Sequence, residues 1–187
     1  QALDGATGDL RWEYKPGTPT GAAAPRGIVR GVAIYQDRIY VNVPDGRVVA
    51  LDARTGKVAW STQVPNMPQG GAFSTAPVVA RGKVVSAMQN CGRFSEEKCS
   101  IVAHDAQTGK EVWRTLVVPK PGEPGSESWG DVPFLYRAGA ETWANGSYDP
   151  DLNLVFWGTT QAKPWSRAAR GTDGDALFSN CTLALDI

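Results

Sequence analysis

One spaced pattern, Asp-x-x-Thr-Gly-x-x-x-Trp, occurs three times in this chain and constrains its fold more than any other feature. The copies are Asp4, Thr7, Gly8 and Trp12; Asp52, Thr55, Gly56 and Trp60; and Asp105, Thr108, Gly109 and Trp113. Ala184-Leu185-Asp186 at the C-terminus matches the opening of a fourth copy. Repetition at fixed spacing over such distances is typical of propellers and solenoids, which stack copies of one supersecondary unit.

Each copy predicts a tight corner between two strands. Its Asp can accept hydrogen bonds from the backbone N–H groups two and three residues later, as Asp does in turns. Its Gly supplies the positive φ that the turn into the next strand requires. The Trp then lies flat between neighbouring units, where an aromatic side chain buries about 150–250 Å². The sequence therefore predicts units that dock onto one another through tryptophan.

The segments around these corners favour antiparallel strands with alternating side chains. The first unit is predicted to contain strands at Ile28–Tyr35, Arg38–Val43, Arg47–Leu51 and Lys57–Trp60. The second is predicted to contain Ala76–Ala80, Lys83–Met88, Ser100–His104 and Lys110–Trp113. The third is predicted to contain Gly146–Asp149, Leu154–Gly158 and Cys181–Asp186. Turn residues separate the strands, and Asp45-Gly46 is a hairpin signal.

We therefore predict an all-β fold in which residues 1–187 form part of a β-propeller, with about three blades of four antiparallel strands. The repeat corners lie at 4–12, 52–60 and 105–113. Because propellers close with about four to eight blades, the chain is predicted to be a fragment. Equivalent alanines are 53 residues apart from Ala50 to Ala103 but 81 apart from Ala103 to Ala184. The third unit thus has extra loop, where function is often located.

Composition excludes several classes of partner. The chain has 19 basic and 19 acidic residues, so no net charge attracts it to nucleic acid or to an anionic membrane. No apolar run approaches the roughly 18 residues of a membrane-spanning helix. The N-terminus also lacks the basic start and apolar core of a signal peptide, although processing could have removed one.

The cysteines favour an oxidising compartment. Cys91 and Cys99 flank a polar loop between two predicted strands, where hairpin ends come within disulfide distance. The alternative is two free thiols. Their spacing, with no second pair, argues against a zinc site.

The only histidine gives little support for catalysis. His104 occupies the position that Leu3 and Leu51 fill in the other copies. A strand residue that replaces leucine is the favoured interpretation, and a catalytic dyad is the alternative. A single histidine also excludes a metal site with several histidine ligands inside this chain.

Four further tryptophans, all in the enlarged third unit, are Trp129, Trp143, Trp157 and Trp165. Trp157 lies in an apolar strand and Trp165 follows a proline, so we expect both to pack. Trp143 lies in a loop of small residues before a strand. Packing of its indole in the core or between blades is the favoured interpretation, and presentation to a flat ligand is the alternative.

Taken together, these segments resemble the quinoprotein alcohol dehydrogenases, the methanol and ethanol dehydrogenase family that depends on pyrroloquinoline quinone (PQQ). The resemblance covers essentially the whole chain. The residues that carry it, besides the three repeats, are Arg30-Gly31-Val32-Ala33, Ser74-Thr75-Ala76-Pro77, Trp129-Gly130-Asp131, Thr142-Trp143, Ser147-Tyr148-Asp149-Pro150, and Gly158-Thr159-Thr160-Gln161-Ala162-Lys163-Pro164-Trp165.

The resemblance implies an eight-bladed periplasmic propeller with PQQ on its axis, beside Ca²⁺ or a lanthanide. It further implies that Trp143 stacks on the quinone, and that Arg30, Thr75 and Thr142 contact the cofactor. These roles suit PQQ, because guanidinium and hydroxyl donors match its three carboxylates and an indole matches its face. The implied activity is oxidation of a small alcohol or polyol, with electrons passed to a cytochrome c-type acceptor.

The sequence departs from the family pattern at three places. Ala24-Pro25 stand where family members often have adjacent cysteines. Gln161 stands at the asparagine metal ligand and is the one metal ligand that the resemblance assigns here. The metal-binding glutamate has no clear counterpart, and Glu96 and Glu97 are the nearest acids. The family's catalytic aspartate falls beyond Ile187.

A non-enzymatic propeller scaffold, similar to outer-membrane assembly lipoproteins, is the alternative function. Such a scaffold would keep the repeat tryptophans without needing Trp143 and Arg30 together. Open blade edges also predict self-association, or completion by the remaining blades of a longer chain.

Overall fold

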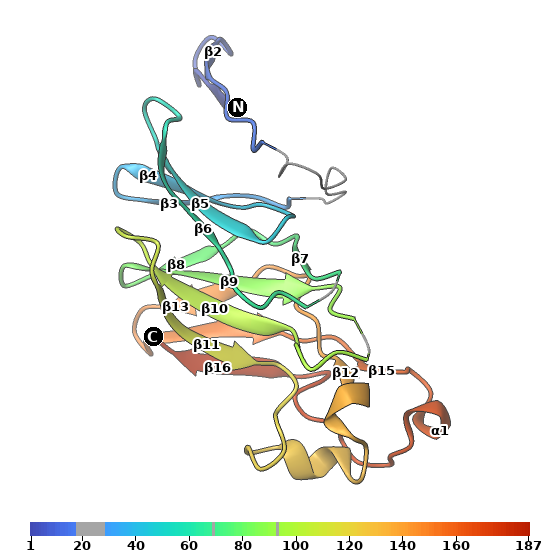
Figure 1. Cartoon of the computed structure of the whole chain (residues 1–187). Coiled ribbons are helices and arrows are strands. Elements are labelled where there is room, and N and C mark those ends of the chain that lie inside the picture. The colour runs from blue at the N-terminus through green and yellow to red at the C-terminus, as the bar shows by residue number, and fades with distance from the viewer. Residues whose placement is uncertain (18–28, 69, 93) are drawn as a thin grey trace.

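The structure is a computed structural model that describes residues 1–17, 29–68, 70–92 and 94–187. Its strands form antiparallel blades that lie side by side along the chain (Figure 1). The first blade is β3 (Ala33–Tyr35), β4 (Arg38–Asn42), β5 (Arg47–Asp52) and β6 (Val58–Gln63). The second is β8 (Val78–Ala80), β9 (Lys83–Gln89), β10 (Ser100–Asp105) and β11 (Glu111–Leu116), with β7 (Ala72–Phe73) also paired to β9. The third is β13 (Ser147–Asp149), β14 (Leu154–Gly158) and β16 (Thr182–Asp186), and a hairpin of β1 (Ala2–Leu3) and β2 (Leu10–Trp12) precedes them all.

The prediction of an all-β partial propeller is confirmed, and most strand bounds differ from the predicted ones by only a few residues. The largest difference is at β3, which was predicted from Ile28 but begins at Ala33. Ile28 lies outside the described residues. Arg30, within the predicted strand, donates its backbone N–H to the Ser74 carbonyl at 3.1 Å. Its backbone therefore pairs with a loop of the next blade.

The repeat corners have the predicted hydrogen bonds. The Asp52 carboxylate accepts the backbone N–H groups of Arg54 at 3.1 Å and Thr55 at 2.7 Å. The same two bonds form at Asp4 and at Asp105. The glycines of the three copies have φ values of 78°, 69° and 72°, which glycine adopts without strain.

Tryptophan docking joins each of the first two corners to the next blade. The Trp12 indole donates to the Ala53 carbonyl at 3.1 Å, and that of Trp60 donates to the Ala106 carbonyl at 3.0 Å. Each ring covers the corner glycine of the next copy, so that a Cβ added at Gly56 would lie 2.5 Å from the Trp12 ring. These positions tolerate only glycine.

Trp113, the third repeat tryptophan, has a buried indole N–H without a partner among the described residues. Ile187 holds the place of Ala53 and Ala106, but its carbonyl accepts the Asn153 side chain at 2.9 Å.

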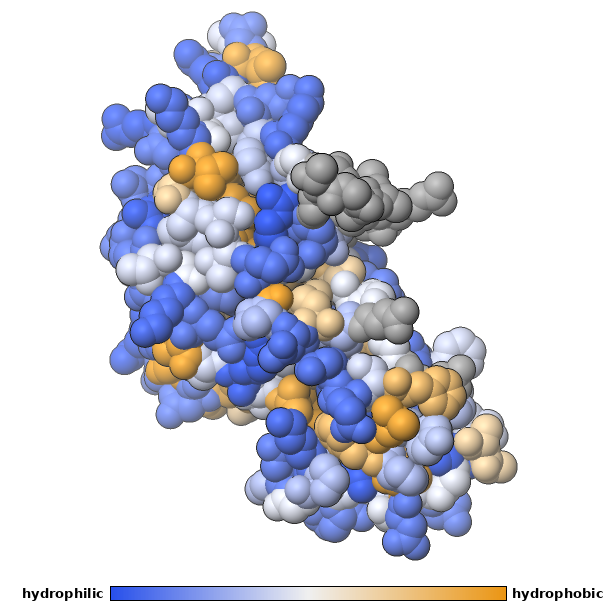
Figure 2. All heavy atoms as spheres, in the orientation of Figure 1, coloured by the Kyte–Doolittle hydropathy of each residue, from blue (hydrophilic) through white to orange (hydrophobic). Residues whose placement is uncertain are grey.

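The core runs through the middle strands of the blades, with Val84, Val85, Ile101 and Val102 wholly buried. His104 is buried with them, and neither ring nitrogen has a hydrogen-bond partner in the described chain. Burial, partly opposed by the nearby Glu111 charge, lowers the pKa of His104. The favoured interpretation of His104 as a strand residue of the core is therefore supported. Outside, hydrophilic residues cover most of the face in Figure 2, and hydrophobic ones appear in scattered groups.

The extra chain of the third unit forms two segments, which extend below the blades in Figure 1. They contain two 3₁₀ helices (Ser126–Trp129 and Phe134–Tyr136), the short helix α1 (Arg167–Arg170), and the paired strands β12 (Ala138–Gly139) and β15 (Ala162–Lys163). The segments are joined where the Trp129 indole donates to the Leu177 carbonyl and the Leu177 N–H donates to the Ser128 hydroxyl. The prediction that this unit has the additional loop is confirmed.

The predicted disulfide is present between Cys91 and Cys99, whose Cα atoms are 5.4 Å apart. It closes the loop between β9 and β10, and both cysteines are buried. The predicted departure at Ala24-Pro25 lies outside the described residues.

Candidate functional site

The predicted site residues lie where the innermost strands of the blades begin or are interrupted. In the second blade, β7 and β8 pair with the two ends of β9, and Ser74–Pro77 separate them. Pro77 has no N–H to donate to a strand partner. In the third unit, residues 140–146 separate β12, which pairs with β15, from β13, which pairs with β14. Because β8 contacts both β3 and β13, these interruptions and the segment before β3 come together.

Arg30 joins the three segments. Its backbone N–H bonds to the Ser74 carbonyl, and its guanidinium also reaches that carbonyl, at 3.4 Å. The guanidinium carbon lies 5.7 Å from the centre of the Trp143 ring, within the range of a cation–π interaction. The structure thus brings Arg30 and Trp143, 113 positions apart in the sequence, into direct contact.

A hydrogen bond from the first blade holds the backbone of Thr75 in place. Its carbonyl accepts the Asn42 amide at 3.0 Å, and the amide oxygen of Asn42 accepts the Ser86 hydroxyl at 2.7 Å. The Thr75 side-chain hydroxyl is buried and has no partner within the described chain. An unsatisfied buried hydroxyl at this place is a donor that a ligand could use, although the surrounding residues now cover it completely.

Thr142 holds the loop that carries Trp143. Its backbone N–H and its hydroxyl both donate to the Met88 carbonyl, at 3.1 and 2.7 Å. On the other side of the loop, the Asn145 side chain accepts the Ala76 backbone N–H at 3.0 Å. The loop is therefore anchored to the second blade on both sides of the indole.

The tryptophan side chains of the third unit differ in how much of their surface is exposed. Trp157 is buried, as expected, and its indole donates to the Ala144 carbonyl at 2.9 Å. Trp143 is 50% exposed, which favours presentation of its face over core packing. The expectation that Trp165 packs is wrong, because Trp165 is 74% exposed. A proline before an aromatic residue does not determine burial.

The donor set predicted for a metal does not come together. Among the described residues, no group of three His, Cys, Asp or Glu side chains is placed to hold a metal ion. The residue Gln161 is exposed, and its backbone carbonyl accepts the Ala140 N–H at 3.2 Å. Glu96 and Glu97 line a different concavity, of about 1110 Å³, against β11. The described residues therefore do not fit a hard cation, which prefers several oxygen ligands.

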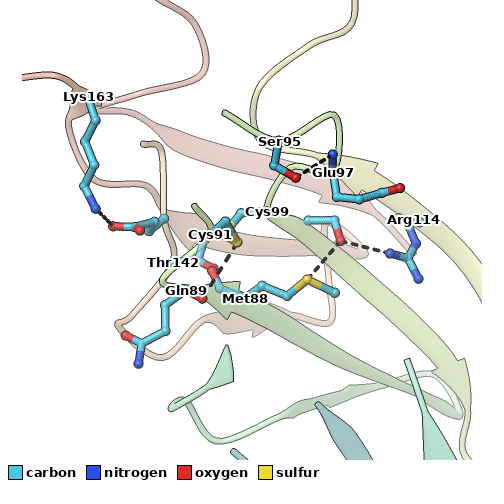
Figure 3. The surroundings of a disulfide bond; sticks show 11 residues. Met88, Gln89, Cys91, Ser95, Glu97, Cys99, Arg114, Thr142 and Lys163 are labelled. Carbon is cyan, nitrogen blue, oxygen red and sulfur yellow. Dashed lines mark hydrogen bonds and ion pairs between the residues drawn. A yellow bond between two sulfur atoms is a disulfide. The ribbon is translucent and has the colours of Figure 1, made fainter. Parts of the chain in front are cut away.

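A cavity of about 550 Å³ lies beside the Trp143 loop. Its lining residues are Asn90, Cys91, Gly92, Glu141, Lys163, Pro164 and Trp165. The Lys163 ammonium donates to the Glu141 carboxylate at 2.7 Å, near the disulfide (Figure 3). Sequence reasoning did not find this ion pair, because nothing in the sequence links two residues 22 positions apart. Only the pairing of β12 with β15 places them together.

Comparison with known proteins agrees with this architecture. A family model described as the PQQ β-propeller domain of glucose, ethanol and alcohol dehydrogenases matches residues 1–187. The chain therefore belongs to this PQQ-dependent dehydrogenase family. Quinohemoprotein alcohol dehydrogenase ADH IIB of Pseudomonas putida is 34% identical over 98% of the chain. The chain spans only 28% of the length of that relative.

Solved structures show the same relationship. Quinohemoprotein alcohol dehydrogenase ADHIIG of Pseudomonas putida HK5 superposes with a TM-score of 0.82 at 32% identity, covering 98% of this chain and 29% of that one. A europium-containing methanol dehydrogenase superposes with a TM-score of 0.78 at 27% identity, covering 94% and 34%. In the part of the chain that the structure describes, no helix is long and apolar enough to cross a membrane.

The residues present fit PQQ better than they fit a metal. A half-exposed indole with a guanidinium beside it suits a flat, carboxylate-bearing quinone. The guanidinium at 5.7 Å leaves too little room for a ring between it and the indole. Arg30 and a stacked ring therefore could not occupy the same area of the Trp143 face.

Proposed function

We propose that the natural protein containing this chain is a PQQ-dependent dehydrogenase that oxidises a small alcohol or polyol. The observation that carries the proposal is the contact of Arg30 with the half-exposed face of Trp143. PQQ, when bound, supplies the oxidising quinone to which the hydride of the alcohol is transferred. The chain contributes one side of the cofactor site, and family membership supports the assignment.

The residues divide into ligand contacts and positioning residues. Trp143 offers the stacking face and Arg30 offers the guanidinium to a carboxylate. The Thr75 hydroxyl, which has no partner among the described residues, is covered by its neighbours and would donate to a ligand only once they move aside. Thr142 has already used its hydroxyl on Met88, so we propose that it positions the Trp143 loop. We propose no step through Gln161 or a metal ion, because the described donor set does not fit one.

We further propose a periplasmic location and a cytochrome c-type electron acceptor. Quinohemoprotein relatives support the acceptor, and the Cys91–Cys99 disulfide supports an oxidising compartment.

The test is calorimetric titration of PQQ into the natural protein and its Trp143→Ala and Trp143→Phe variants. We expect Trp143→Ala to weaken binding by about 5- to 150-fold, since stacking on an aromatic side chain contributes about 1–3 kcal/mol. Trp143→Phe keeps a flat face and should lose less. Melting temperatures should change little, because the indole is half-exposed.

Two results would count against the proposal. Unchanged affinity of Trp143→Ala would assign Trp143 to packing. Absence of PQQ binding by the natural protein, with Ca²⁺, with La³⁺ and without metal, would favour the non-enzymatic scaffold.

A further inference from the structure

Among the ion pairs of the described residues, the Glu141–Lys163 pair is the one that lines the cavity next to the Trp143 loop. Its oxygen and nitrogen are 2.7 Å apart, and both residues line the cavity next to the Trp143 loop. The Glu141 side chain is only 9% exposed and that of Lys163 is 29% exposed. Removing two charges from water to this extent is costly unless their remaining hydrogen-bonding capacity is used.

Part of that capacity is unused. The second carboxylate oxygen of Glu141 is buried and has no hydrogen-bond partner among the described residues. The Lys163 ammonium has three N–H donors, and Glu141 takes one of them. A buried, unsatisfied carboxylate oxygen and an ammonium with spare donors at one cavity indicate a ligand that bears both an oxygen acceptor and, nearby, a donor.

Backbone pairing fixes the position of this ammonium. Lys163 is the last residue of β15 and is paired with Ala138 of β12. Glu141 is tied to the segment just before β15, because its carbonyl accepts the Thr160 N–H at 2.9 Å. The positive charge is thus attached to rigid backbone, two residues after Gln161 and on the segment after β14.

The cavity offers few side-chain oxygen ligands to a metal. Among its described lining residues, Asn90 is the only amide and Glu141 is the only acid, and an ammonium group already neutralises Glu141. Gln161 is exposed and does not line the cavity. A fixed cation is nevertheless present here, in the form of Lys163.

We propose that the Lys163 ammonium, held by Glu141, provides the positive charge that receives an oxygen of the bound quinone, in place of a divalent or trivalent metal ion. The recognised group is a carbonyl or carboxylate oxygen, which an ammonium donor satisfies through a charge-assisted hydrogen bond. The proposal rests on the proposed PQQ function and deepens it. Its consequence is that quinone binding at this site needs neither Ca²⁺ nor a lanthanide.

The experiment is calorimetric titration of PQQ into the natural protein under three conditions: with chelator, with Ca²⁺ and with La³⁺. We expect the three dissociation constants to agree within about twofold. Lys163→Met should weaken binding with chelator by about 10- to 100-fold, the range of one hydrogen bond to a charged group. Lys163→Arg keeps a cation and should recover most of the affinity. Lys110→Met removes an exposed lysine and should have no effect.

Each other outcome overturns the proposal. Binding by the natural protein only in the presence of a metal would show that the cation is a metal ion. Unchanged affinity of Lys163→Met with chelator would leave the ion pair a structural feature. If Lys163→Met does not fold, Lys163→Gln gives the same comparison, because it keeps a donor without the charge. Failure to bind PQQ under all three conditions would overturn the proposed function itself, a result distinct from metal-dependent binding.

Discussion

The repeat corners of the first two blades and the extra segments of the third unit are held by different kinds of contact. At each of the first two corners an indole covers a glycine and donates to one carbonyl of the next blade. In the third unit, the buried guanidinium of Arg137 instead donates hydrogen bonds to the carbonyls of Val132, Ser126 and Gly130. Repeated contacts join the blades, whereas this irregular cluster holds residues 126–137 to one another.

This difference indicates which parts of the molecule can be destabilised independently of one another. A docking contact joins two blades, so its loss affects the shared core. The Arg137 cluster closes a loop upon itself and contacts no blade corner through these bonds. We expect the first kind of change to lower global stability and the second to open the third unit locally.

The largest effect is expected for Trp60→Ala. Its indole covers Gly109, donates to the Ala106 carbonyl and lies 6.0 Å from the Tyr40 ring. Removal of a packed tryptophan costs about 3–5 kcal/mol, and partial exposure places Trp60 near the lower value. Urea unfolding of the natural protein measures the loss. Trp165→Ala, which removes a 74% exposed indole, is the matched control and should change stability by less than about 0.5 kcal/mol. Equal effects of the two substitutions would refute the docking role.

A smaller and more local effect is expected for Arg137→Met. The guanidinium donates to the carbonyls of Val132 at 2.8 Å and Ser126 at 3.1 Å, and burial lowers its pKa. Methionine would leave these carbonyls unpaired, at about 1–3 kcal/mol.

Hydrogen exchange followed by mass spectrometry tests where that cost appears. Residues 117–139 should exchange faster in Arg137→Met, while β4 and β5 keep their protection. Arg54→Met removes an exposed arginine and should leave both regions unchanged. Faster exchange throughout the first blade would show that the two regions are not independent.

The difference between the two regions also determines what the sequence could predict. Strands β5, β9, β10 and β14 were predicted well, because alternation and turn residues are local signals. The two-residue strands β7, β12 and β15 were missed, since two residues show no period. Arg30 and Trp143 were proposed for one site from a family resemblance, and the structure brings them together. The Glu141–Lys163 pair could not be predicted, because it depends on how an irregular loop folds back.

The smallest expected effect is a gain in stability, on replacing His104 with the leucine found at the same position of the other copies. It tests whether the repeats are interchangeable at that position. His104 fills a leucine position, its two buried nitrogens have no partner among the described residues, and burial lowers its pKa below the ordinary histidine value. Between the folded pKa and about 6.5 the unfolded chain binds more protons, so stability falls as the pH drops through this range. His104→Leu should remove that dependence and add about 1–2 kcal/mol at pH 7, because no unpaired polar atom remains.

Urea unfolding at pH 7 and pH 5 measures both parts of this prediction. The reverse change, Leu51→His, places the same imidazole at the buried equivalent position of the first blade. It should destabilise the protein and create a new loss of stability at low pH. If His104→Leu were instead destabilising, the histidine would make an interaction that the leucine positions lack, and the equivalence of the copies would end at the corner residues. If both substitutions behave as expected, the repeat is one structural unit with a replaceable core position, and specialisation in this molecule is confined to its loops.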